Sequence, residues 1–140
     1  MNPFTRRKAR RFLLQALYEW QISGNPLNEI EAALITKINP KKVDVEYFHQ
    51  VLHAIPAKLD TLDAQLEPYL DRPLKNLNPI ELVALRIGVY ELRYRIDIPY
   101  RVAINEAVEV TKVFGSNEGH KYVNGVLDKL AKELRKTELN

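Results

Sequence analysis

The stretch that decides the fold is residues 78–94, which read NPIELVALRIGVYELRY. Asn78 followed by Pro79 is a helix start signal, because the asparagine side chain can cap the first turn and proline suits the first helical position. The residues that follow are apolar nearly all round, which is typical of a helix covered by several neighbours. We therefore expect a central, buried helix in an all-α protein.

Helical periodicity continues on the C-terminal side of this stretch. A helix over about 103–114 should end at Gly115, and Ser116 or Asn117 should cap the last helix. Gly125 lies in the middle of that last helix, where glycine costs stability, so it predicts a closely approaching neighbour. The basic side chains of the last helix are expected to point mostly outward: Lys121, Lys129, Lys132, Arg135 and Lys136.

Helices are also predicted on the N-terminal side, which brings the expected total to six or seven. Gly24 and Asn39-Pro40 should end a first helix over about 5–23 and a second over about 26–38. Asp44 can cap a third helical stretch. That stretch keeps helical register through Pro56, so this proline marks either a kink or the first turn of a new helix.

A concentrated block of positive charge lies on the first predicted helix. Apolar residues continue at helical spacing through the block, so it belongs to an amphipathic helix docked on a core rather than to a disordered arm. The net charge of the 140-residue chain is only +3, so the positive charge is concentrated here. Arginine matches phosphate oxygens, which favours nucleic acid as the partner; a solvated helix face or an anionic membrane surface are the alternatives. The five basic residues are Arg6, Arg7, Lys8, Arg10 and Arg11.

The composition excludes or disfavours several classes of function. The chain has no cysteine, which excludes disulfides, thiolate catalysis and thiolate metal sites. No phosphate-binding loop or activated nucleophile is recognisable, so we expect no catalytic residues and no cofactor. His49 and His53 have the i, i+4 spacing of a metal pair, but position 50 is Gln rather than the glutamate of the metalloprotease motif. Two surface histidines and no metal site are therefore predicted.

Several ordered motifs along the chain resemble the family of transcription antitermination factor NusB, in particular its gamma-proteobacterial members. The resemblance covers essentially the whole chain, and the motifs together are far more specific than any one of them. They are RRKAR (6–10), QALY (15–18), LRI (85–87), YEL (90–92), PYRVAINEA (99–107) and HKYVNGVLDK (120–129).

This resemblance implies a fold and a function. The fold would be a single NusB-like domain of two packed bundles of three to four helices each, over about 1–75 and 76–140. The protein would be a non-enzymatic factor that binds boxA single-stranded RNA together with ribosomal protein S10. It would join other Nus factors on RNA polymerase during ribosomal RNA transcription. A cytoplasmic protein is expected, since no apolar run approaches the roughly 20 residues that cross a bilayer.

The resemblance also assigns site residues. Glu81 and Glu118 match positions at the S10 interface, although each also stands where local helix electrostatics favours an acid. Tyr18 continues the stripe of Arg7 and Arg11 and either stacks on a base or is a half-buried core ring. Many relatives have phenylalanine in place of Tyr122. The implied RNA-contacting residues are Arg6, Arg7, Lys8, Arg10, Arg11, Tyr18, Lys121 and Tyr122.

Two questions stay open at this stage. The basic helix could instead bind an acidic protein surface, which would make the chain a protein–protein interaction adaptor. The free protein could be a monomer or a homodimer in which the basic helix is masked until S10 binds.

Overall fold

The computed structural model describes residues 2–139, and every regular element in that range is a helix. This confirms the predicted all-α class. The chain divides into two compact units, residues 1–57 and residues 58–140. The two-bundle division near residue 75 stays a prediction. Within residues 2–139, no helix combines the length and the apolar character needed to cross a membrane.

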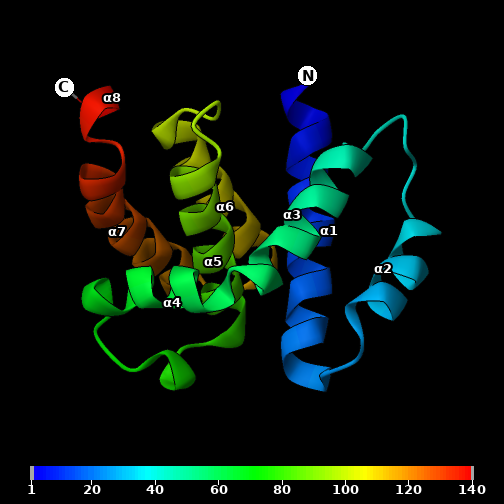
Figure 1. Cartoon of the computed structure of the whole chain (residues 1–140), viewed down its shortest axis with the longest axis horizontal. Helices are drawn as coiled ribbons and strands as arrows, with labels where there is room; N and C mark the ends of the chain where they lie inside the picture. The colour runs from blue at the N-terminus through cyan, green and yellow to red at the C-terminus, as the bar shows by residue number, and fades with distance from the viewer. Residues whose placement is uncertain (1, 140) are drawn as a thin grey trace. The chain divides into compact units, whose positions relative to one another are not determined.

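The first unit contains three helices, α1 (Pro3–Ser23), α2 (Leu27–Ile35) and α3 (Val45–Ala57), and α1 packs against both of the others (Figure 1). Gly24 ends α1 in the left-handed conformation, with φ of 72°, as predicted. Asp44 caps α3 as predicted, because its Oδ1 accepts a hydrogen bond from the Tyr47 N–H at 3.1 Å. The second helix ends three residues before the predicted Ile38, which is buried in the turn that follows.

The second unit is built around α5 (Pro79–Tyr94), which contacts α4, α6 and α7. Every residue from Leu82 to Leu92 is buried, as expected of a helix covered on all sides. Asn78 caps the helix as predicted, since its Oδ1 accepts from the Ile80 N–H at 2.9 Å. The other elements are α4 (Leu59–Leu66), η1 (Glu67–Tyr69), η2 (Leu74–Asn76), α6 (Tyr100–Phe114), α7 (Asn117–Leu134) and α8 (Lys136–Leu139).

The break expected at Pro56 falls two residues later. Helix α3 continues through Pro56 to Ala57, Lys58 leaves the helical conformation with φ −111° and ψ 17°, and α4 begins at Leu59. The proline therefore occupies the last turn of a helix rather than a kink or a first turn. Its missing N–H removes one backbone hydrogen bond there, which favours termination of the helix just beyond it.

The glycine that permits close helix packing is Gly88 on α5, and the prediction for Gly125 is wrong. Gly125 is exposed, and a Cβ added there would meet no atom within 4 Å. A Cβ at Gly88 would lie 2.5 Å from Cδ1 of Leu127 on α7. The close approach of a neighbour therefore exists in this unit, but α5 supplies the glycine.

Arg135 is buried rather than outward-pointing, which corrects the prediction for the end of the last helix. The residue is 3% exposed, and its Nε donates to the Leu92 carbonyl at 2.7 Å. Its Nη2 donates to three further carbonyl groups at the end of α5 and in the following turn, at 2.8 to 3.1 Å. The last carbonyls of a helix lack partners within the helix, and the guanidinium supplies a donor to the Leu92 carbonyl there. The Glu91 and Arg95 carbonyls also accept from the backbone N–H groups of Arg95 and Ile98. The three groups belong to Glu91, Arg95 and Ile98.

Candidate nucleic-acid interface

The outer face of α1 carries an exposed stripe in which aromatic and aliphatic side chains flank a polar and cationic centre. The stripe residues follow one another at alternating spacings of four and three, which places them on one side of an α-helix. At about 1.5 Å per residue the stripe extends over roughly 27 Å. We call it the α1 stripe; it consists of Phe4, Lys8, Arg11, Gln15, Tyr18 and Ile22, all exposed.

Two of the predicted RNA-contacting arginines are turned toward the body of the first unit. Arg10 is 3% exposed, and its guanidinium lies 5.3 Å from the centre of the buried Tyr47 ring. Arg6 lies 5.0 Å from the same ring, and its Nε is 3.3 Å from Oδ2 of Asp44. Cation–π contact and the Asp44 carboxylate therefore hold these two guanidinium groups against α3. In this conformation Arg10 fixes α1 in place rather than facing a ligand.

The remaining predicted residues of α1 differ in exposure. Lys8 and Arg11 are exposed, while Arg7 is half-buried. Tyr18 is 37% exposed, so its side chain is partly open to solvent. Phe4 is 69% exposed and was missed by the sequence analysis, although its spacing of four from Lys8 is the signal that would have placed it on this face.

The second predicted RNA-contacting patch lies at the start of α7. The Lys121 Nζ is 3.5 Å from a carboxylate oxygen of Glu118, and both side chains are largely exposed. The Tyr122 hydroxyl donates to Oδ1 of Asp71 at 3.0 Å, and the Arg72 guanidinium lies 5.4 Å from the Tyr122 ring. One face of this ring is therefore occupied by a cation, and a base could stack only on the other face.

Electrostatics holds this patch together. Arg72 donates two hydrogen bonds to the Asp71 carboxylate, at 2.7 and 2.9 Å. These bonds, with the one from Tyr122, lower the pKa of Asp71 from 3.8 to about 2. Partial burial and the bond to Asp71 raise the pKa of Tyr122. Asp71 is therefore ionised and Tyr122 is neutral at physiological pH, and the cluster carries one fixed negative and one fixed positive charge.

The two predicted partner-contacting residues lie close to this patch. Glu118 is exposed in the first turn of α7. Glu81 is half-buried on α5, and a Cβ added at Gly119 would lie 2.9 Å from its Oε2, so its carboxylate packs against the start of α7. Negative charge is favourable at a helix N-terminus, so both acids are placed where the helix itself stabilises them.

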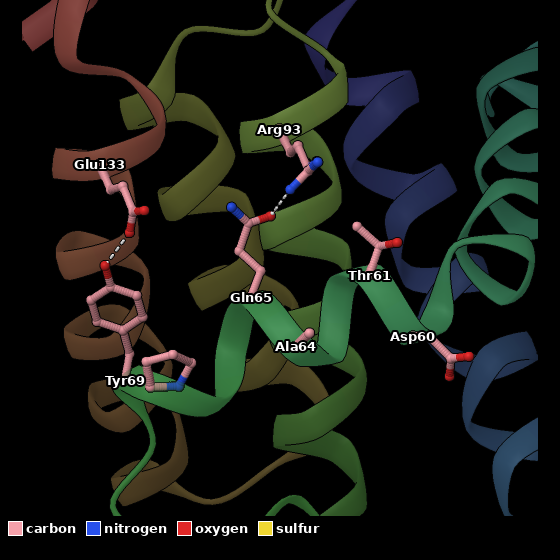
Figure 2. Close-up of a pocket in the computed structure, with 8 residues that line it drawn as sticks. Asp60, Thr61, Ala64, Gln65, Tyr69, Arg93 and Glu133 are labelled. Atoms are coloured by element: carbon pink, nitrogen blue, oxygen red, sulfur yellow. Dashed lines mark hydrogen bonds between the residues drawn. The ribbon is translucent and has the colours of Figure 1, made fainter.

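The second unit also contains an open pocket of about 730 Å³ between α4, η1, α5 and α7 (Figure 2). Its polar groups are largely paired with one another. Tyr69 donates a hydrogen bond to Glu133, which raises the pKa of Tyr69, and Arg93 donates to Oε1 of Gln65 at 2.6 Å.

Comparison with known proteins decides the family. The model of the NusB family matches residues 7–132. The chain belongs to the NusB family. A transcription antitermination protein NusB from Idiomarina loihiensis is 52% identical over 137 residues, which cover 98% of this chain and 99% of that protein. The family consists of transcription antitermination factors and not of enzymes, as the sequence analysis predicted.

Solved structures agree with this assignment. Thermotoga maritima NusB superposes with a TM-score of 0.82 at 29% identity and covers 95% of each chain. A structure of antitermination factors NusB and NusE in complex with double-stranded RNA superposes with a TM-score of 0.79 at 25% identity, over 91% of this chain and 96% of that one. The predicted NusB-like fold is therefore confirmed.

Proposed function

We propose that this antitermination factor binds boxA single-stranded RNA through the α1 stripe and the Lys121–Tyr122 patch, in partnership with ribosomal protein S10. The observation that carries the proposal is the α1 stripe itself, in which Lys8 and Arg11 lie between Phe4 and Tyr18 on one exposed face. Non-specific single-strand recognition combines cations that follow the backbone with aromatic rings on which bases stack. The α1 stripe presents both kinds of group in one line.

We assign different roles to the residues of the proposed interface. Lys8 and Arg11 are the cations that contact phosphate, with Arg7 beside them. Arg6 and Arg10 hold the helix on α3 through Tyr47 and Asp44 and thereby orient the exposed cations. If three to five phosphates are neutralised in all, log affinity should fall with log salt with a slope of roughly −2 to −3.5.

S10 is the proposed protein partner, and the acidic residues of the second unit are its proposed contacts. NusE, which is ribosomal protein S10, is present with NusB in one of the superposed structures. Glu118 is 85% exposed, and its pairing with Lys121 is a surface contact of low strength, so its carboxylate is available to a basic partner. In the cytoplasm this complex would act with other Nus factors on RNA polymerase.

A mobility-shift experiment tests the RNA part of the proposal. A boxA RNA should be retarded more strongly than scrambled RNA of equal length, and more strongly again with S10 present. The double variant Lys8→Glu/Arg11→Glu should lose at least about 100-fold in affinity, because two phosphate contacts become repulsive. Lys41→Glu/Lys42→Glu makes the same change in charge at exposed positions outside the α1 stripe, and should retain most of the affinity.

Other outcomes favour the alternatives. Equal loss in both double variants would show that net charge alone attracts RNA and would contradict the α1 stripe. If the Lys8→Glu/Arg11→Glu variant keeps boxA affinity but loses an acidic protein partner, the basic helix belongs to an interaction adaptor. Stronger binding of a double-stranded competitor than of boxA would overturn the single-strand assignment. Light scattering with and without S10 tests whether a homodimer masks α1.

A further inference from the structure

Three side chains from two helices of the first unit converge on one point. Glu31 lies on α2, and His49 and His53 lie one turn apart on α3. The Nδ1 atom of His49 is 2.5 Å from Oε2 of Glu31, and the Nε2 atom of His53 is 2.7 Å from Oε1. One potential ligand atom from each residue lies within 4.8 Å of the other two. The sequence analysis found the histidine pair but not its carboxylate, because the acid comes from a different helix.

The exposure of the three side chains is graded. The Glu31 side chain is 16% exposed, that of His53 is 36% exposed and that of His49 is 63% exposed. The carboxylate therefore forms the base of the cluster, and the two rings form its open side. Ions have access from solvent, and water can complete a coordination sphere. The two ring centres are 4.6 Å apart and tilted by 51°, so their nitrogen atoms approach the carboxylate from different directions.

We propose that Glu31, His49 and His53 bind a divalent transition-metal ion of the Zn²⁺ class. Two imidazole nitrogens and one carboxylate oxygen are the ligands that Zn²⁺ and its neighbours Co²⁺ and Ni²⁺ accept, with a water in the remaining position. Ca²⁺ and Mg²⁺ prefer sites built from oxygen alone, so they should not compete. The i, i+4 histidine spacing places both rings on one face of α3, which is the arrangement that zinc sites on helices use.

Metal binding requires a small rearrangement that the site permits. Ligand atoms about 2.0–2.1 Å from a tetrahedral metal are roughly 3.3 Å apart, so the present contacts of 2.5 and 2.7 Å must open by less than about 1 Å. The ligand atoms lie within 4.8 Å of one another, so no pair has to close by more than about 1.5 Å. The exposed rings can supply this by side-chain rotation. The metal would replace the proton shared in each hydrogen bond, and binding therefore releases protons when the histidines are protonated.

The bound ion would fasten α2 to α3. Ile30 is the buried residue of α2, so this nine-residue helix has a small apolar anchor. Glu31 follows Ile30 directly, and a metal bond through its carboxylate would add a second attachment beside the first. Anything that binds the folded state alone stabilises it in proportion to its concentration and affinity. The expected consequence is slower hydrogen exchange of the α2 amides when Zn²⁺ is present.

Calorimetric titration of the full chain with ZnCl₂ tests the site. We expect one Zn²⁺ per chain, and visible d–d absorption of tetrahedral type when Co²⁺ replaces it. His49→Ala and His53→Ala should each weaken Zn²⁺ binding by more than about 100-fold, since removal of even an outer-shell partner costs 10–100-fold. Glu31→Gln should weaken it similarly. His120→Gln, which removes the remaining histidine of the chain and lies in the second unit, is the matched control and should bind like the unchanged protein.

Two results would overturn the proposal. One is the absence of Zn²⁺ binding at concentrations of ion well above that of the protein. The other is binding that His49→Ala leaves unchanged or that His120→Gln weakens equally, which would show dispersed surface association. His49 is largely exposed, so its variant keeps the fold and makes this comparison decisive. Hydrogen exchange of α2 that does not respond to Zn²⁺ would contradict the attachment between the two helices.

Discussion

Helices α1 and α7 are both amphipathic and both carry several basic residues, yet the direction in which each basic side chain points does not follow from its charge. In α1 the exposed cations are Lys8 and Arg11, while Arg10 packs under the helix on Tyr47. At the other helix, Lys121 is exposed, while Arg135, directly after its last residue, is buried among backbone carbonyls. In each region one arginine is a structural residue.

Arg10 and Arg135 show which surroundings allow a guanidinium group to be buried. Arg10 is held by an aromatic face, and Arg135 by four carbonyl oxygens in two turns of chain. A planar group with five donors can satisfy several acceptors at once, and its flat face is weakly hydrated, so it is buried more readily than an ammonium. The number of basic residues in a stretch of sequence is therefore larger than the number of cationic groups that are exposed to a ligand.

The largest expected effect concerns Arg135. Arg135→Ala should lower the free energy of unfolding by about 3–5 kcal/mol, because the Leu92 and Ile98 carbonyls lose this donor and Glu138 loses its ion pair. Lys132→Ala, at an exposed position of α7, should change it by less than about 0.5 kcal/mol. Urea denaturation followed by circular dichroism measures both. Equal effects would show that Arg135 is not a structural residue.

The next effect separates Arg10 from Arg11. Arg10→Ala should destabilise the protein by about 1–2 kcal/mol through lost contact with Tyr47 and lost packing of its aliphatic part. Arg11→Ala should leave stability within about 0.5 kcal/mol and reduce the salt slope of RNA affinity by about 0.7. Thermal unfolding and RNA titration at several salt concentrations provide the two readouts. Loss of stability in Arg11→Ala together with a reduced salt slope in Arg10→Ala would contradict these roles.

A third pair of variants compares the glycines of α5 and α7. Gly88→Ala should cost up to about 2 kcal/mol, because overpacking against Leu127 exceeds the gain in helix propensity. Gly125→Ala should stabilise the protein by about 0.5–1 kcal/mol, since its added methyl group meets no neighbour. Denaturation midpoints of the two variants should therefore move in opposite directions. A destabilising Gly125→Ala would restore the original prediction of a close neighbour there.

The smallest expected effect is the pH response of the Asp71 cluster. The pKa of Asp71 is lowered to about 2, so its contacts with Arg72 and Tyr122 are present above about pH 4 and are lost as the pH falls toward 2. An NMR titration should show the Asp71 carboxyl carbon and the Tyr122 ring changing together in that range. Asp71→Asn should remove the transition. A midpoint near 3.8 would show that the cluster does not persist in solution.

The parts of the fold that were predicted correctly depend on local sequence. Asn78 and Asp44 are capping residues, and Gly24 ends a helix, because each acts on backbone groups within a few residues of itself. The buried character of α5 follows from its composition alone. The sequence therefore predicted where these elements lie in the chain with small errors, such as the position at which α2 ends.

The parts that were missed depend on contacts between distant segments. Arg135 interacts with carbonyls some 40 residues earlier, and Glu31 meets a histidine 18 residues later. Arg10 is an exception, because it stands three, four and seven residues before the buried Leu13, Leu14 and Leu17, so the apolar pattern of α1 alone could have placed it on the inner face. The site was predicted as a region, and the contacts of each side chain with distant residues required the structure.

The bonds of Arg135 also have a consequence for synthesis of the chain. The carbonyl of Ile98 leaves the ribosome 37 residues before the guanidinium that it accepts from. At about 5–20 residues per second, that interval is roughly two to seven seconds. Throughout this interval the Leu92 and Ile98 carbonyls lack their Arg135 donor, whereas Tyr47 and Asp44, which contact α1, belong to the first third of the chain. The residues that hold α1 in place, Tyr47 and Asp44, are therefore synthesised well before the last helix.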